Sequence, residues 1–252
     1  MKRSLLTAAI LALLLAVAVT APATQNQNAR TFMDGTEAYR NGDWPAAIAA
    51  FESLAESGVN SGKLFYNLGN AYLKNDDLGR ALMWYERALK HIPDDPDLRF
   101  NYEYALTLTK EERGEKESPL LRILFFWKYE LSPSTVGWIA ILLNAALWIA
   151  LSILVVRKKR LLRPSVVLTA AATVIFCATA AFNYVEPIRV RYAVILTEQA
   201  AVRSGFTDTA TQLFVLHAGT RVRVERETDT RLLIRYTEDK IGWVKRSEAE
   251  II

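Results

Sequence analysis

The side chains that most often bind metals or act as nucleophiles are few in this chain. It contains one cysteine, Cys177, and two histidines, His91 and His217. Metal sites of the His and Cys type need several such ligands that converge, whereas these three residues fall in different segments. With a single cysteine no internal disulfide can form, and a thiol in an apolar run usually packs as a small hydrophobic side chain. We predict no metal and no cofactor.

General acid–base catalysis is not predicted either. Acidic pairs such as Asp94-Asp95 and Glu111-Glu112 occur, but they lie in highly charged stretches, where carboxylates are usually solvated. Such catalysis needs two carboxylates in different environments of one pocket. The sequence also lacks the short motifs of serine hydrolases, zinc proteases and nucleotide-binding loops. We therefore predict that the protein is not an enzyme.

Binding chemistry is better represented, by aromatic, amide and basic side chains in the first half of the chain. The candidates for contact with a partner are Tyr39, Arg40, Tyr66, Asn70, Lys74, Phe100 and Tyr104, with Phe32 beside them. Aromatic and arginine anchors tend to carry the binding energy of protein interfaces. We predict that these residues bind a segment of a protein partner. For Phe32 and Phe100, packing against a neighbouring helix is the alternative.

A repeat of 34 residues positions these candidates. Residues of one kind recur at that spacing: Gly35 and Gly69, Asn41 and Asn75, Asp43 and Asp77, Ala47 and Ala81, and Phe51 and Tyr85. This is the tetratricopeptide pattern of two helices joined by a tight turn, in which small residues allow close helix crossing and aspartate caps the second helix. We predict an all-α repeat domain over residues 28–113, ended by a capping helix that starts at Pro96. The first helix of each pair lines the groove of such a domain, and all the candidates fall on these first helices.

Two apolar runs, residues 137–156 and 165–185, are uncharged and long enough to cross a bilayer as helices. Residues 157–164, between them, hold five Lys and Arg and no acid, and the positive-inside rule places such a loop in the cytoplasm. Residues 1–23 have the pattern of a signal peptide. Both lines of argument predict a protein of the bacterial inner membrane with its two soluble domains in the periplasm. Residues 119–131 are expected to form an interfacial amphipathic helix or, alternatively, a linker packed on the repeats.

The net charge of +4 is unevenly distributed along the chain. Residues 24–118 carry 16 acidic and 11 basic side chains, so the repeat region is acidic. Much of the basic excess lies in the short loop between the apolar runs. This pattern argues against an extended basic face of the kind that binds nucleic acid.

The last part of the chain, residues 190–252, changes to a hydrophobic period of two. Five or so short strands separated by turn residues predict a small all-β barrel there. The region resembles the bacterial SH3 family in three segments, in that family's order and spacing: Val202-Arg203-Ser204-Gly205, Leu216-His217-Ala218-Gly219-Thr220 and Ile241-Gly242-Trp243-Val244. Ala201 stands where the family usually has Asn, and Phe206 where it usually has Pro. The resemblance implies a cell-wall peptide or another protein as ligand, and we expect Trp243 to pack in the core.

The order of segments as a whole resembles the BatE-type member of the Bacteroides aerotolerance (Bat) family. This resemblance implies a membrane-associated complex with von Willebrand A-type Bat proteins and a MoxR-type AAA+ ATPase, linked to oxygen or envelope stress tolerance. We predict a membrane-anchored scaffold that binds protein partners through the repeat groove. The alternatives are a peptidoglycan-binding envelope sensor and an accessory subunit of a cell-wall hydrolase, which would need a catalytic domain in trans.

Overall fold

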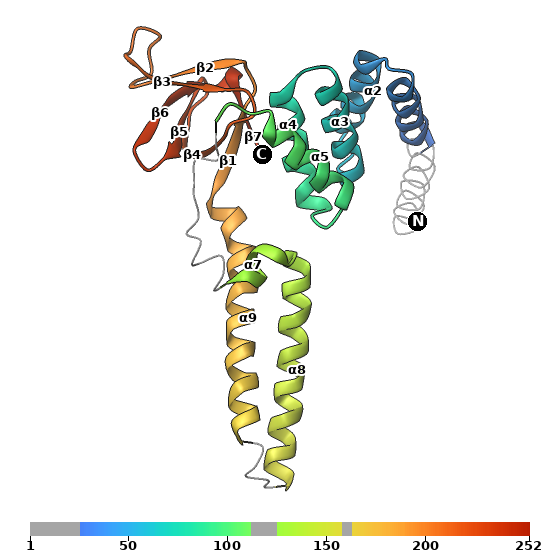
Figure 1. Cartoon of the computed structure of the whole chain (residues 1–252), viewed down its shortest axis with the longest axis vertical. Coiled ribbons are helices and arrows are strands. Elements are labelled where there is room, and N and C mark those ends of the chain that lie inside the picture. The colour runs from blue at the N-terminus through green and yellow to red at the C-terminus, as the bar shows by residue number, and fades with distance from the viewer. Residues whose placement is uncertain (1–25, 112–124, 158–162) are drawn as a thin grey trace, which may run out of the picture. The chain divides into compact units, whose positions relative to one another are not determined.

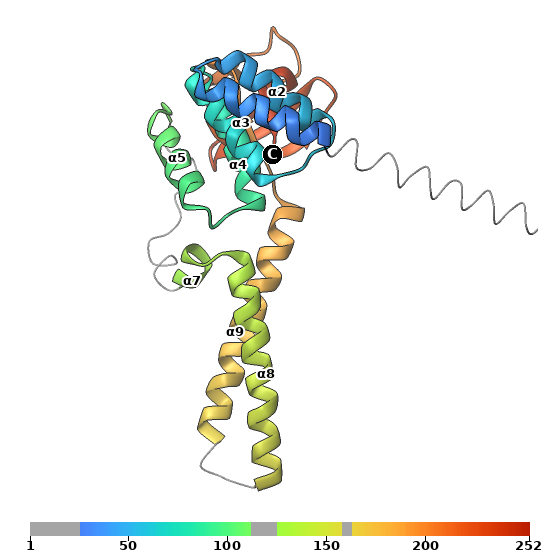
Figure 2. The same ribbon diagram turned by 90° about the vertical axis from the view of Figure 1, so that its right-hand side faces the viewer.

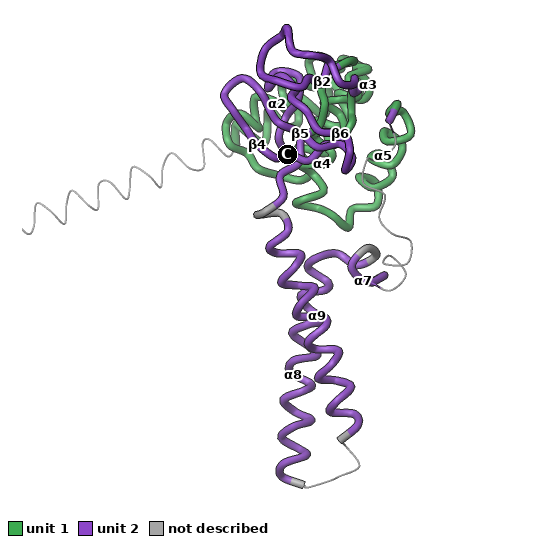
Figure 3. Tube along the Cα trace, turned by 90° about the vertical axis from the view of Figure 1, so that its left-hand side faces the viewer, with its two compact units in different colours: residues 1–110, 194–199, 217–220 green, residues 111–193, 200–216, 221–252 purple. Residues whose placement is uncertain are grey.

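Residues 26–111, 125–157 and 163–252 are described in the computed structural model (Figure 1). The predicted signal peptide lies outside the described residues, as do the first part of the predicted interfacial segment and most of the basic loop. The chain divides into two compact units, coloured separately in Figure 3: residues 1–110 with 194–199 and 217–220, and residues 111–193 with 200–216 and 221–252.

The helical part of the first unit follows the 34-residue period. Its helices span residues 26–40, α2 (Trp44–Glu56), α3 (Gly62–Lys74), α4 (Leu78–His91) and α5 (Pro96–Thr107). The helix over 26–40 and α2 form the first repeat, α3 and α4 form the second, and α5 begins a third unit at the predicted proline. Figure 1 shows α2 to α5 as successive coils.

Aspartate caps start the second helix of each repeat, as predicted. The carboxylate of Asp43 accepts a hydrogen bond of 3.1 Å from the backbone N–H of Ala46. The carboxylate of Asp77 accepts the equivalent bond of 3.0 Å from Arg80. Each carboxylate satisfies an N–H group that has no partner within its own helix. Asp95 caps α5 in the same way.

Close helix crossing explains the glycine and aromatic positions of the period. A Cβ added at Gly35 would lie 2.7 Å from the ring of Phe51, and one at Gly69 would meet the ring of Tyr85 still more closely. Phe51 and Tyr85 are almost completely buried, with exposed fractions of 1% and 0%. The same glycine–ring contact therefore joins the two helices within each repeat. No residue larger than glycine fits there without a shift of the ring.

Two long apolar helices, α8 (Pro133–Arg157) and α9 (Arg163–Arg189), belong to the second unit and run side by side in Figures 1 and 2. Within the stretches Pro133–Val156 and Pro164–Glu186, the most apolar 18 residues have mean hydropathies of 2.6 and 2.0, and few of these residues are buried. Both are long and apolar enough to cross a membrane. Each helix contains the apolar run that predicted it and continues a few residues beyond.

A short helix, α7 (Phe126–Glu130), precedes α8. The ring of Trp127 stacks on Phe176 of α9 with 5.7 Å between centroids. The ammonium group of Lys128 lies 4.4 Å from the ring centroid of Phe182 on the same helix. At the described end of the predicted interfacial segment, Trp127 and Lys128 therefore pack against α9, whereas Phe125 and Phe126 are exposed.

The C-terminal region forms one antiparallel sheet of seven strands rather than the predicted barrel of five or so. The strands are β1 (Arg191–Ile195), β2 (Gln199–Arg203), β3 (Gln212–His217), β4 (Arg221–Glu227), β5 (Arg231–Thr237), β6 (Lys240–Lys245) and β7 (Ala249–Ile251). Their order in the sheet is β3-β2-β6-β5-β4-β1-β7. Because β3 and β7 stand at opposite ends of this order, the sheet is not closed, and a closed SH3-like barrel is not confirmed. Trp243 is buried with 7% of its surface exposed, as predicted.

Candidate functional site

The predicted binding residues lie on the first helix of each repeat and on the capping helix. They are Tyr39 and Arg40 at the end of the helix over 26–40, Tyr66, Asn70 and Lys74 on α3, and Phe100 and Tyr104 on α5. On α3 and α5 the candidates are spaced four residues apart, which puts them on one face of the helix. Each of these two helices thus presents one stripe of candidate side chains.

Asn70 is the centre of a hydrogen-bonded cluster that joins α3, α4 and α5. Its Oδ1 accepts a bond of 2.7 Å from the hydroxyl of Tyr85 and one of 2.9 Å from Nδ2 of Asn101. Nδ2 of Asn101 also donates to the hydroxyl of Tyr66 at 3.0 Å. We call Tyr66, Asn70, Tyr85 and Asn101 the polar cluster.

The polar cluster leaves donors available. Both acceptor positions of the Asn70 oxygen are used inside the protein, and among the described residues nothing accepts a hydrogen bond from its NH₂ group. The side chain is half-buried. A half-buried amide with available N–H donors is suited to a backbone carbonyl of a bound peptide.

Tyr85 in the polar cluster and Tyr39 both have raised pKa values. Burial raises the pKa of Tyr85, and the neighbouring phenols of Tyr66 and Tyr39 raise it further. Burial also raises the pKa of Tyr39, with Tyr66 contributing. The ring of Tyr39 meets that of Trp44 edge-on, with 5.0 Å between centroids. The hydroxyl of Tyr85 therefore remains a hydrogen-bond donor to Asn70 at neutral pH.

The two residues for which packing was the alternative behave differently. Phe32 is half-buried, and its ring centroid lies 5.5 Å from that of Phe51, so it packs within the first repeat. Phe100 is 75% exposed, and Tyr104, four residues later, is 54% exposed. An adjacent pair of exposed aromatic rings on α5 is apolar area that the described part of the chain leaves uncovered.

Arg40 and Lys74 occupy equivalent positions, 34 residues apart, at the ends of the first helices. Both side chains are exposed. Neither forms an ion pair with a carboxylate of the described residues. They add two unneutralised cations beside the aromatic residues.

Sequence reasoning missed Tyr85 and Asn101 as members of the site. Tyr85 entered the prediction only as one of the residues that recur at the 34-residue spacing, and Asn101 was not predicted. One signal was present, because Tyr85 carries a hydroxyl where the first repeat has Phe51. No pattern in the sequence pairs Asn101 with Asn70, since the two are 31 residues apart, three short of the period.

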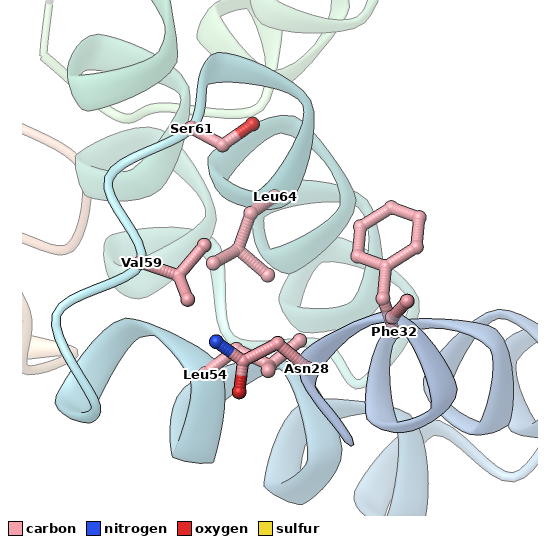
Figure 4. A pocket seen from close by; sticks show the side chains of 7 residues that line it. Asn28, Phe32, Leu54, Val59, Ser61 and Leu64 are labelled. Carbon is pink, nitrogen blue, oxygen red and sulfur yellow. The ribbon is translucent and has the colours of Figure 1, made fainter. Parts of the chain in front are cut away.

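A pocket of about 320 Å³ lies between the helix over 26–40, the end of α2 and the start of α3 (Figure 4). It is lined by Asn28, Ala29, Phe32, Leu54, Val59, Ser61 and Leu64. The lining is largely apolar and holds no titratable side chain. Within the described ranges, no group of three or more His, Cys, Asp or Glu is arranged to hold a metal ion.

Comparison with known proteins supports the repeat assignment. A tetratricopeptide repeat family model matches residues 32–96. Two relatives, both Photosystem I assembly protein Ycf3, come from Prochlorococcus marinus and from a Synechococcus species. Each is 30% identical over 86 residues, which is 33% of this chain and 47% of the relative. The chain thus spans about half the length of the curated relatives it matches, and the similarity is confined to about a third of this chain. Residues 32–96 form a tetratricopeptide-like region of the kind that binds other proteins.

Proposed function

We propose that this protein is a membrane-anchored interaction scaffold that binds a segment of a protein partner along its repeats. The observation that carries the proposal is the polar cluster around Asn70, with its available N–H donors, next to the exposed rings of Phe100 and Tyr104. Tetratricopeptide repeats suggest protein–protein interaction, and α8 and α9 are long and apolar enough to hold such a scaffold in a membrane.

The chemistry of this surface favours a peptide with acidic groups. The Asn70 amide suits a backbone carbonyl, the exposed rings suit apolar side chains, and Arg40 and Lys74 suit carboxylates. Two repeats offer a small surface, so the intrinsic affinity is expected to be low. Confinement of both partners to one membrane raises their effective concentration and offsets that weakness.

The finer proposal is a scaffold of a Bat-type envelope complex, with von Willebrand A-type Bat proteins and a MoxR-type AAA+ ATPase as partners. Its support is the order of segments: repeats, paired apolar helices with a basic loop, and a C-terminal β region. The matched relatives are named as assembly proteins, which is consistent with a scaffold role for the shared repeat region. In this proposal both soluble regions lie in the periplasm.

A charge-reversal experiment tests the docking surface. The Arg40→Glu/Lys74→Glu variant is expected to keep its helical circular dichroism and to lose most of the partners recovered by pull-down from detergent extracts. The matched control is Arg30→Glu/Lys63→Glu, which makes the same charge change with exposed residues on the same two helices. The proposal fails if the first variant recovers the full partner set at the wild-type yield.

Two further measurements separate the finer alternatives. Binding of the purified protein to isolated peptidoglycan sacculi, with no protein partner in the pull-down, would favour the envelope sensor. Alkaline phosphatase fused after Ile252 is expected to be active, and the same enzyme fused into the basic loop is expected to be inactive. The opposite pattern would overturn the periplasmic orientation.

A further inference from the structure

Two cations stand directly opposite each other in the C-terminal sheet. Arg231 on β5 pairs with Lys245 on β6 in antiparallel register. Like charges at directly opposite positions destabilise an antiparallel pair. The cost is increased here because the side chain of Arg231 is only 7% exposed, and a charge withdrawn from water needs a partner.

A carboxylate from a neighbouring loop lies between these cations. Oδ1 of Asp208 accepts a hydrogen bond of 2.7 Å from Nη2 of Arg231 and lies 3.3 Å from Nζ of Lys245. In the described part of the chain, Asp208 is the carboxylate with which the Arg231 guanidinium pairs. The hydrogen bonds from Arg231 and Lys245 hold the pKa of Asp208 below its usual value. The arrangement is a two-cation site with one carboxylate in it.

The same loop covers an aromatic surface with Phe206. Its ring centroid lies 4.1 Å from that of Trp243. Trp243 and Lys245 are two residues apart on β6 and therefore project from the same face of the strand. The loop segment Phe206-Thr207-Asp208 thus places an aromatic ring and a carboxylate, two residues apart, on a tryptophan and two cations.

Exposure distinguishes the covering loop from the surface under it. Trp243 is 7% exposed and the Arg231 side chain equally so, whereas Phe206 is 57% exposed and the Asp208 side chain 68%. The loop is closed by its own bonds, from the N–H of Ser204 to the oxygen of Thr211 at 2.9 Å and from Arg203 to the oxygen of Ala210 at 2.8 Å. Its contacting side chains lie at the surface, and what they cover is part of the folded sheet.

We propose that Trp243, Arg231 and Lys245 form a peptide-binding site, and that Phe206 and Asp208 occupy it when no partner is bound. The partner is a protein segment with an aromatic residue two positions before an acidic side chain. In an extended strand such residues point to the same side, so the segment can bring a ring and a carboxylate to this face together. This site is separate from the repeat groove, and its test does not depend on the groove.

The test uses the full chain in detergent micelles and a fluorescent peptide, Gly-Phe-Thr-Asp-Thr, with the sequence of residues 205–209. Binding is measured by anisotropy. The Phe206→Ala/Asp208→Ala variant is expected to bind this peptide at least about tenfold more tightly than the wild type, because the resident groups no longer compete. The control Met33→Ala/Asp239→Ala removes an exposed apolar side chain and an exposed carboxylate elsewhere, and it is expected to bind as the wild type does.

Two altered peptides read out the chemistry of the site. Replacing the peptide's Asp by Asn, or its Phe by Ala, is expected to weaken binding to the double variant at least about tenfold. Adding Lys245→Gln to the double variant is expected to remove the gain. Asp208→Asn keeps the shape of the loop and is expected to show a smaller gain in peptide affinity. It is the second variant, for use if the double variant does not fold.

The proposal is overturned if neither Asp208 variant binds the peptide better than the wild type. It is also overturned if the Asn peptide binds as tightly as the Asp peptide, because the cations would then not recognise a carboxylate. In that case Asp208 serves only to neutralise Arg231 and Lys245 within the sheet.

Discussion

The two repeats share one backbone arrangement and differ in the chemistry of equivalent side chains. In the first repeat Phe32 packs on Phe51. In the second, Tyr66 and Tyr85 stand 34 residues later, with 6.2 Å between ring centroids. Both Phe51 and Tyr85 are buried against a glycine. The second repeat therefore keeps the packing and adds two hydroxyl groups.

Those hydroxyls connect the core of the second repeat to its surface. Tyr85 donates to Asn70, whereas Thr36, which is the residue equivalent to Asn70 in the first repeat, bonds to the backbone oxygen of Phe32. The polar cluster consequently exists in the second repeat and α5 and has no counterpart in the described part of the first. The second repeat thus acquires the polar cluster by changing a few atoms at positions that packing already determines.

The largest expected effect comes from removing the two buried rings, which tests whether they stabilise their repeats equally. Tyr85→Ala and Phe51→Ala each remove a buried ring and are expected to destabilise their repeat by about 3–5 kcal/mol. Tyr85→Ala is expected to lower stability more, because it also removes the hydrogen bond that the Tyr85 hydroxyl donates to Asn70. Native-state hydrogen exchange on the full chain would compare amides of α3 and α4 with those of α2. Equal losses in both repeats would show that the cluster adds no stability.

The caps give the next largest effect. Asp43→Ala and Asp77→Ala are each expected to destabilise the following helix by about 1 kcal/mol. Asp77 also pairs with Arg80 at 2.5 Å on the surface, and such an exposed pair contributes little. The two losses, measured as hydrogen-exchange protection of α2 and α4, are therefore expected to agree closely. A much larger loss at Asp77 would contradict the equivalence of the caps.

Tyr85→Phe converts the second repeat to the chemistry of the first. The ring remains, one hydrogen bond to Asn70 is lost, and stability is expected to fall by about 1 kcal/mol. Partner recovery by pull-down is expected to fall as well, because Asn70 loses one of the two bonds that orient it. The reverse change, Phe51→Tyr, is the matched control for partner recovery. Full recovery with Tyr85→Phe would separate the polar cluster from docking.

The smallest effect concerns the turns. Gly42 and Asp76 are equivalent and both have positive φ, 79° and 61°. A residue with a Cβ is strained there and glycine is not. Asp76→Gly is expected to stabilise the second repeat by about 0.5 kcal/mol, and Asp76→Ala to destabilise it, by the same exchange measurement. A loss of stability with glycine would mean that the Asp76 side chain contributes more than its backbone strain costs.

The sequence alone determined the features that repeat or run continuously. The 34-residue period predicted the helix pairs, the caps and the close crossings at Gly35 and Gly69, because each depends on residues near one another in a periodic pattern. Length and apolarity predicted α8 and α9. Hydrophobic alternation with a period of two predicted most of the strands. Gly242 breaks that alternation in β6, and β7 has only three residues, so a barrel of five or so strands was expected.

Only the tertiary structure decided which polar side chains meet. Asn70 and Asn101 come together because α5 packs beside α3, and their spacing of 31 residues has no signature in a 34-residue period. Arg231 and Lys245 meet Asp208 because strand register and loop path bring together three residues from three segments. Periodicity records which face of an element is buried, whereas a cluster of hydrogen bonds or charges depends on the register between elements, which packing alone sets.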